Sequence, residues 1–153
     1  KLLEIGCGSG FLSILTAKKG ADVTAVDTNP DAVEITRNNA ETNNVRMDVI
    51  HSDLFKKVPD KFDIIIFNPP YLPVEEGEDD ITYAGGKTGR DVIEKFIDKI
   101  SGHLKPDGTV LLLISSLTGE KETIQLFAKQ RMKTEIIARA KIPWEELIVI
   151  KAF

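Results

Sequence analysis

The sequence has 153 residues, of which 42% are hydrophobic and 29% are charged, and its formal net charge is −4. This length and composition are typical of a globular domain with a core of its own, and the acidic balance disfavours a protein that grips bare nucleic acid through phosphate contacts. No apolar run approaches the roughly 18 residues of a membrane span, no secretory signal or metal-ligand spacing is visible, and a single cysteine excludes an internal disulfide.

The chain opens with a predicted strand, a glycine-rich turn and a helix. Leu2 to Ile5 is a short apolar run, the turn Gly6–Gly10 follows it, and residues 11–19 have helical spacing. Glycines in such a turn let the backbone approach a ligand closely, and the helix start offers free N–H groups. The spacing is Gly-x-Gly-x-Gly, not the Gly-x-Gly-x-x-Gly of dinucleotide binders. The carboxylate of Glu4 favours a ligand with an ammonium group over a pyrophosphate.

Acidic residues follow the next two predicted strands. Residues 22–27 form the second strand, which ends in Asp27, and residues 47–51 form the third, which is followed by Asp53. An acid at the end of the second strand is where doubly wound folds bind a ribose diol. A carboxylate after the third strand can accept a hydrogen bond from an exocyclic amine. Taken singly, each acid is also a common turn or cap residue.

The fourth predicted strand, residues 62–67, runs into Asn68-Pro69-Pro70-Tyr71. Neither proline can donate to a strand ladder, so the strand stops here, and each residue before a proline is held extended. The turn presents a side-chain amide, two backbone carbonyls and a phenol. An Asn-Pro pair alone is also an ordinary turn signal. Parallel strands, however, bring their carboxyl ends to one edge of a sheet, which places Asn68 with the earlier strand ends.

The remaining pattern predicts further helices and an antiparallel finish. Residues 74–87 are predicted to be a loop, with five acidic residues between positions 75 and 80 that would repel phosphate and favour a basic partner. His51, His103 and Cys7 are interpreted as structural residues. The other predicted elements are helices over 30–43 (capped by Asn29), 90–104 and 120–130, a turn over 105–108, and strands over 110–114, 132–140 and 145–153.

The motif Glu4-Ile5-Gly6-Cys7-Gly8-Ser9-Gly10, with Asp27, Asp53 and Asn68-Pro69-Pro70-Tyr71, resembles the S-adenosylmethionine-dependent methyltransferases of the seven-stranded class, and the resemblance covers nearly the whole chain. The stretch Ala84–Arg90 more narrowly resembles the HemK-type glutamine methyltransferases. The best match is the archaeal and eukaryotic branch, which modifies the Gly-Gly-Gln glutamine of class 1 release factors.

The resemblance implies an α/β, Rossmann-like, mostly parallel sheet of seven strands with helices on both faces. Its strand order would be 3-2-1-4-5-7-6, with the last strand antiparallel. We expect a single methyltransferase domain over residues 1–153. Because the chain begins without methionine inside an apparent strand, we also expect that an N-terminal segment is missing.

The resemblance further implies residue roles. Glu4 and the glycines would hold the methionine moiety of S-adenosylmethionine, Asp27 the ribose hydroxyls, and Asp53 with Leu54 the adenine edge. Asn68 and the Pro69 carbonyl would hold the substrate amide, with Tyr71 packing beside it. The implied cofactor-binding residues are Glu4, Gly6, Gly8, Gly10, Asp27, Thr28, Asp53, Leu54 and Asn68, and the implied catalytic residues are Asn68, Pro69, Pro70 and Tyr71.

The resemblance implies a cytoplasmic enzyme whose substrate is a release factor and whose product is S-adenosylhomocysteine. A small zinc-binding activator subunit would pair with the exposed edge of the third strand, around residues 47–51. The hydropathy predicts no membrane partner, and the acidic balance disfavours a nucleic acid as partner. Two other methyltransferases stay open: one acting on the exocyclic amine of adenine in nucleic acid, which the same four residues can hold, and one acting on protein lysine. An oxidoreductase with a dinucleotide cofactor and a catalytically silent cofactor-binding scaffold are weaker alternatives.

Overall fold

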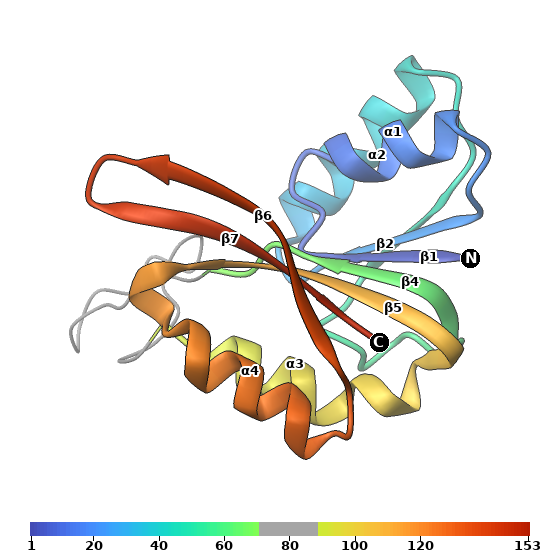
Figure 1. Cartoon of the computed structure of the whole chain (residues 1–153). Helices are drawn as coiled ribbons and strands as arrows, with labels where there is room; N and C mark the ends of the chain where they lie inside the picture. The colour runs from blue at the N-terminus through green and yellow to red at the C-terminus, as the bar shows by residue number, and fades with distance from the viewer. Residues whose placement is uncertain (71–88) are drawn as a thin grey trace. The chain divides into compact units, whose positions relative to one another are not determined.

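The computed structural model describes residues 1–70 and 89–153 (Figure 1). The predicted loop over 74–87 and Tyr71 lie outside these residues. The strands are β1 (Leu2–Ile5), β2 (Val23–Asp27), β3 (Asp48–His51), β4 (Phe62–Phe67), β5 (Leu104–Ser115), β6 (Thr134–Ile142) and β7 (Glu145–Ala152). The α-helices are α1 (Phe11–Lys18), α2 (Pro30–Thr42), α3 (Asp91–Lys99) and α4 (Glu120–Lys129), and 3-10 turns span Ile100–Gly102 and Ser116–Thr118.

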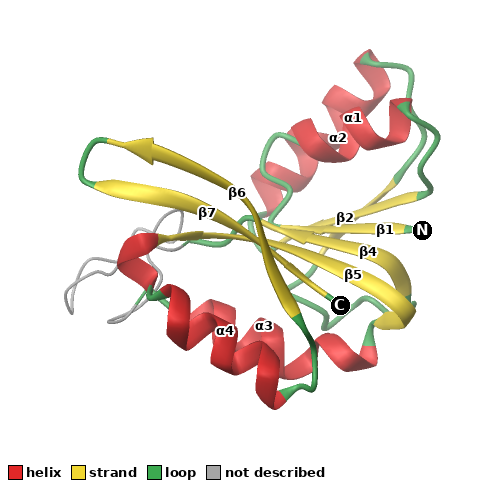
Figure 2. Ribbon diagram, viewed as in Figure 1, coloured by secondary structure: helices red, strands yellow, loops and turns green. Residues whose placement is uncertain are grey.

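The seven strands follow the order β3-β2-β1-β4-β5-β7-β6 (Figure 2). The expected α/β fold and strand order are therefore confirmed. β7 is antiparallel to both β5 and β6, as expected for the last strands of this sheet. None of the helices in the described ranges is long and apolar enough to cross a membrane.

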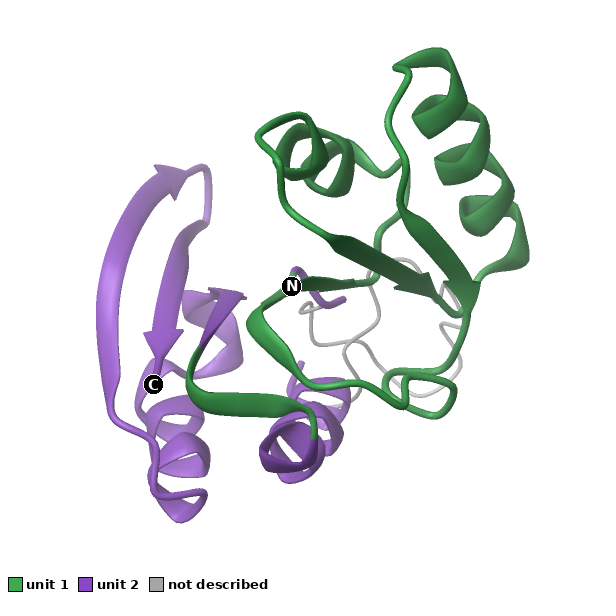
Figure 3. Cartoon of the chain, turned by 90° about the vertical axis from the view of Figure 1, so that its right-hand side faces the viewer, with its two compact units in different colours: residues 1–67, 103–108 green, residues 68–102, 109–153 purple. Residues whose placement is uncertain are grey.

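The chain divides into two compact units, residues 1–67 with 103–108 and residues 68–102 with 109–153 (Figure 3). In the first unit, β1 pairs in parallel with β2 and β4, and β2 pairs in parallel with β3. β1 is buried along its whole length, as near-continuous apolar runs in parallel sheets are. Ile5 is in register with both Val26 and Phe67, and Asp27 with His51. The carboxyl ends of these strands are therefore aligned.

The second unit is built on antiparallel pairing and on two amphipathic helices. Ser115 of β5 is in register with Leu147 of β7, and Ile142 of β6 with Glu145 of β7. α3 and α4 contact each other and bury their apolar faces, in which Phe96 and Phe127 are fully buried. The predicted helix over 90–104 ends earlier than expected, because α3 stops at Lys99 and tightens into a 3-10 turn.

The prediction that a turn over residues 105–108 separates two elements is wrong, because β5 begins at Leu104 and continues through these residues. The residue types of this segment nevertheless fit its local backbone conformation. Asp107 has a φ of 63°, and a Cβ at Gly108 would lie 2.7 Å from Leu104 Cγ. The chain thus bends sharply at Pro-Asp-Gly, as these residues favour, while strand geometry continues on both sides of the bend.

Candidate cofactor-binding site

The glycine turn between β1 and α1 has a left-handed backbone at alternate positions. The φ angles of Gly6, Gly8 and Gly10 are 68°, 54° and 77°, and Gly10 N donates to Cys7 O at 2.7 Å to close the turn. A Cβ at Gly8 would meet no atom within 4 Å, whereas one at Gly10 would lie 2.7 Å from Thr36 Cγ2. The turn is therefore open beside Gly8 and tightly packed at Gly10.

Glu4 lies at the base of this turn and is 5% exposed. Its Oε2 accepts hydrogen bonds from the backbone N of Ser13, at 2.8 Å, and from the Ser13 hydroxyl. Ser13 is the third residue of α1, and the N-cap, Gly10, has no side chain to accept such a bond. Glu4 thus caps α1 from a distance, and burial raises the pKa of its carboxyl while the bonds from Ser13 oppose that rise. The N–H groups of Phe11 and Leu12, in the first turn of α1, lack acceptors within the helix.

Asp27 joins the glycine turn to the start of α2. Its Oδ2 accepts a hydrogen bond from Gly8 N and its Oδ1 from Asn29 N, both at 2.9 Å. The predicted cap is confirmed, because Asn29 Oδ1 accepts from Asp31 N at 2.9 Å. A carboxylate has about four acceptor sites, so Asp27 keeps capacity for the hydroxyls of a bound ribose. The carbonyl of the next residue, Thr28, lies 2.9 Å from His51 Nε2.

The segment after β3 is folded back against the end of β2. Ser52 N donates to Asp27 O at 2.9 Å, and Ser52 Oγ donates to Leu54 O at 3.1 Å. Leu54 has a φ of 47°, a left-handed conformation that is uncommon for a leucine. Asp53 is exposed and its Oδ2 lies 2.7 Å from Lys56 Nζ. Asp27 is thus linked through Ser52 to the segment that carries Asp53 and Leu54. The cofactor-binding roles predicted for these residues stay predictions.

The predicted catalytic turn follows β4 without a break. Phe67 is the last residue of β4 and is in register with Ile5, the last residue of β1. Asn68 follows Phe67 in the chain, and Gly6 follows Ile5. Asn68 is exposed and Pro69 is buried, while Pro70 is partly exposed. The roles predicted for these residues stay predictions, and Tyr71 lies outside the described residues.

Several polar residues that support the glycine turn were not identified from the sequence. Thr36 and Asn39, on α2, and Ser13, on α1, each hydrogen-bond to the turn or to Glu4. Thr36 lies on the buried side of α2, where its helical spacing alone is typical of a core residue. For Ser13 a signal exists in the sequence, since a helix that starts after glycine needs a remote acceptor for its first N–H groups.

The residues interpreted as structural make structural contacts. The ring of His103 stacks on Phe55 with a centroid distance of 4.3 Å, and His51 bonds a backbone carbonyl. Burial raises the pKa of the Cys7 thiol to about 11, so the sulfur is protonated and a poor nucleophile at neutral pH. Over residues 1–70 and 89–153, no group of His, Cys, Asp and Glu side chains could hold a metal ion.

The first unit brings together several groups that could hold a cofactor. They are an open glycine turn, first-turn N–H groups on α1, and the carboxylates of Asp27 and Asp53, and they could bind an amino-acid part, a ribose and an amine. Glu4 is less available for such binding, because one of its oxygens is engaged by Ser13. Its other oxygen is the one that could accept from an ammonium group.

Comparison with known proteins gives consistent similarities. The family model described as "Methyltransferase small domain" matches residues 1–141. A Methanocaldococcus jannaschii protein, provisionally named as a protein N5-glutamine methyltransferase, is 49% identical over 99% of this chain and 80% of its own length. A release factor glutamine methyltransferase of Lactococcus lactis is 29% identical over 90% of this chain, which spans 55% of that relative. Among solved structures, the E. cuniculi Mtq2-Trm112 complex, described as responsible for methylation of the eRF1 translation termination factor, matches with a TM-score of 0.80 and 27% identity over 99% of this chain and 82% of that chain.

Proposed function

The chain belongs to the methyltransferase small domain family, and we propose that it transfers a methyl group from S-adenosylmethionine to the side-chain amide nitrogen of the glutamine in the Gly-Gly-Gln motif of a peptide chain release factor. The observation that carries the proposal is Asn68-Pro69-Pro70 placed directly after β4, whose last residue is in register with the strand end that leads into the glycine turn. The similarity to N5-glutamine methyltransferases over 99% of the chain supports the choice of substrate.

The cofactor would be held by the first unit. We assign the methionine moiety to the glycine turn with Glu4, the ribose to Asp27 and Thr28, and the adenine edge to Asp53 and Leu54. When bound, S-adenosylmethionine supplies an electrophilic methyl group on its sulfonium centre. The open space beside Gly8 supports a backbone that approaches the ligand closely.

The chemical difficulty lies in the substrate, because the lone pair of an amide nitrogen is shared with its carbonyl. That resonance is on the order of the 18–20 kcal/mol barrier to peptide rotation. In the proposed mechanism, the side-chain oxygen of Asn68 and the backbone oxygen of Pro69 accept hydrogen bonds from both N–H groups of the glutamine amide. They orient the nitrogen lone pair toward the methyl group and stabilise the positive charge that grows on nitrogen.

The remainder of the rate enhancement would come from positioning. Holding two reactants in line can contribute roughly 7–11 kcal/mol. A strong base is not required, because a methylated amide cation loses its proton to water readily. This agrees with an asparagine, rather than a carboxylate or histidine, at position 68.

We propose a small zinc-binding activator subunit as partner at the edge of β3, in the cytoplasm where release factors act. β3 is the terminal strand in the sheet order. Ser52 N donates to Asp27 on β2, and strand residues alternate in direction, so the carbonyl of Val49 points to the free side. Arg37 Nη2 donates to that carbonyl at 2.7 Å. An edge strand presents unpaired backbone groups that can pair with another chain. The bond from Arg37 covers one of these groups, which agrees with an edge that a partner strand can pair with.

The variant Asn68→Ala tests the assignment. It is expected to abolish methyl transfer, because the amide loses one of its two acceptors, while S-adenosylhomocysteine affinity falls by less than about tenfold. Asn38→Ala, which removes an exposed asparagine of α2, is the matched control and should transfer at the wild-type rate. Turnover by Asn68→Ala at the control's rate would refute the role of Asn68.

A further inference from the structure

We propose that two side chains of α2, Thr36 and Asn39, are positioning residues that hold the glycine turn in its cofactor-binding shape. The inference rests on the proposed function, because it concerns the affinity of that turn for S-adenosylmethionine. Neither residue would itself touch the reacting atoms. Their action would pass through the backbone carbonyls of Gly8 and Ser9.

Thr36 contacts the glycine turn at three positions, although in the sequence it lies 26 residues after Gly10, the last residue of the turn. It is 0% exposed, and its Oγ1 donates to Gly8 O at 3.0 Å and lies 3.4 Å from Cys7 Sγ. Its Cγ2 occupies the space that a Cβ on Gly10 would need. One side chain therefore uses its hydroxyl to orient a carbonyl and its methyl group to fill the inside of the turn.

Asn39 makes the adjacent contact from the same face of α2. Its Nδ2 donates to Ser9 O at 2.9 Å. Residues three apart in a helix lie on one face, so Thr36 and Asn39 present two donors to two successive carbonyls. The turn carbonyls are thereby bonded from outside the turn, which leaves the opposite side open for a ligand.

The two donors act together with Asp27, which accepts from Gly8 N at 2.9 Å. The N–H of Gly8 is bonded on one side and its carbonyl on the other, so the two peptide planes that flank Gly8 are fixed. Glycine has more backbone freedom to lose on ordering than any other residue. A turn that is already fixed before the cofactor arrives binds it more tightly than a free turn, because less freedom is lost on binding.

The experiment compares matched pairs of variants in the whole protein. Thr36→Val removes the hydroxyl but keeps the packing, and Thr42→Val removes a hydroxyl of the same helix that bonds Asn38 O instead of the turn. Asn39→Ala removes the second donor, and Asn43→Ala removes an asparagine that bonds Asn39 O and Lys18 instead of the turn. Thr36→Ser restores the hydroxyl in position.

Calorimetric titration with S-adenosylhomocysteine is the first measurement. Thr36→Val and Asn39→Ala are each expected to bind about 3- to 10-fold more weakly than wild type, as the loss of one hydrogen bond predicts. Thr42→Val, Asn43→Ala and Thr36→Ser should stay within about twofold of wild type. In turnover assays the KM for S-adenosylmethionine should rise in the two positioning variants while kcat changes little, a split that general destabilisation does not produce.

The outcomes separate the two proposals. Wild-type affinity in both Thr36→Val and Asn39→Ala, or equal losses in the matched controls, overturns the positioning role and leaves the proposed function standing. Failure of the wild-type protein to bind S-adenosylhomocysteine overturns the proposed function, and the positioning role with it. If Thr36→Val fails to fold, Asn39→Ala alone decides, because Asn39 is only partly buried.

Discussion

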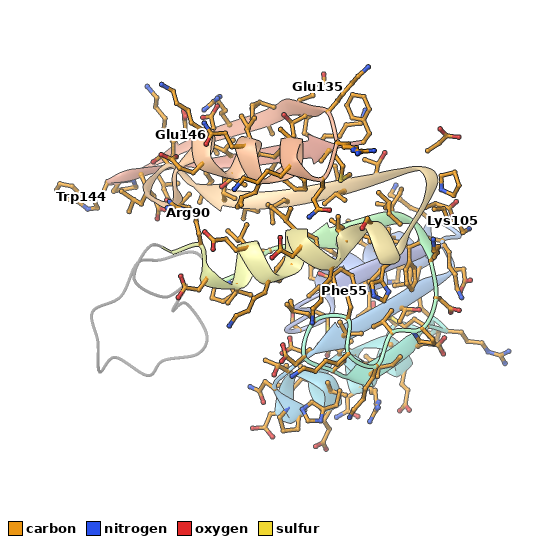
Figure 4. The ribbon with its side chains drawn as sticks, turned by 90° about the horizontal axis from the view of Figure 1, so that it is seen from below. Phe55, Arg90, Lys105, Glu135, Trp144 and Glu146 are labelled. Atoms are coloured by element: carbon orange, nitrogen blue, oxygen red, sulfur yellow. The ribbon has the colours of Figure 1, made fainter. Side chains whose placement is uncertain are left out.

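The glycine turn and the β6–β7 hairpin both depend on left-handed backbone, but they support it in opposite ways. At the glycine turn, residues without a side chain occupy the positive-φ positions, and Asp27, Thr36 and Asn39 bond the backbone from outside. At the hairpin, the two-residue connection is Pro143-Trp144, and Trp144 takes a φ of 76°. Its side chain is 96% exposed and projects from the end of the hairpin (Figure 4).

This difference predicts where each substitution is felt. The glycine turn is held by hydrogen bonds from β2 and α2, so changes there should alter folding or ligand affinity strongly. Residues 138–144 of the hairpin are all exposed, so changes at its tip should alter local stability only. Substitutions in the two regions should therefore differ in how much they change stability.

Gly10→Ala is expected to be the most harmful of these variants. Gly10 and Gly20 both have positive φ, at 77° and 92°, but only a Cβ on Gly10 would collide with another side chain, Thr36. Left-handed backbone costs an alanine roughly 1–2 kcal/mol, and overpacking adds roughly 1–3 kcal/mol. Urea unfolding should therefore show roughly 2–5 kcal/mol lost in Gly10→Ala and only the smaller part in Gly20→Ala. Equal losses in the two variants would contradict the close packing at Gly10.

Glu4→Ala should come next, with a loss of roughly 1–3 kcal/mol, because it leaves the N–H and hydroxyl of Ser13 without their acceptor. Equilibrium unfolding in urea measures the loss. The control is Glu34→Ala on the exposed side of α2, which should change stability by less than about 0.5 kcal/mol. A wild-type midpoint for Glu4→Ala would mean that Glu4 does not cap α1.

Glu4 also predicts a pH dependence. Burial raises the pKa of its carboxyl above the ordinary value of 4.5, so the folded protein holds this proton more tightly than the unfolded chain does. The contribution of Glu4 to stability should therefore fall as the pH rises from about 4.5 through the raised pKa. Glu4→Gln does not titrate, so the stability of wild type relative to Glu4→Gln should fall over the same window. Urea series at several pH values measure it, and a constant difference would contradict the raised pKa.

The smallest expected effect, and the only gain, is at the hairpin tip. Trp144→Gly removes a side chain from a left-handed position and should stabilise the protein by roughly 0.5–1 kcal/mol. Trp144→Ala keeps the strained backbone without the ring and serves as the control. Urea midpoints compare the three proteins. A loss of stability in both variants would contradict the expected gain and would show that the indole ring contributes packing that its exposure does not suggest.

Much of the fold is predictable because its signals are local. The apolar run of β4, the Asn29-Pro30 start of α2 and the acidic end of β2 each depend on a few consecutive residues, and the structure places these elements as expected. The bend at Asp107 was predicted for the same reason, although the continuation of β5 through it was not, since strand pairing depends on residues elsewhere.

The supports of the site could not be predicted in the same way. Thr36 has the helical spacing of a core residue, and nothing in that spacing shows that its hydroxyl bonds Gly8, a residue 28 positions away. Glu4 looks like a ligand-binding acid by position, and only the packed turn shows that Ser13 engages one of its oxygens. Contacts of this kind are set by the packing of α1 and α2 around the turn rather than by any local pattern.

The central claim is tested most directly by finding which atom receives the methyl group. The protein, with and without a zinc-binding activator subunit, is incubated with isotopically labelled S-adenosylmethionine and either a release factor or RNA, and the products are analysed by mass spectrometry. Label is expected on the side-chain nitrogen of the Gly-Gly-Gln glutamine, and none after Asn68→Ala. Label on an adenine of the RNA or on a lysine of the protein would contradict the central claim.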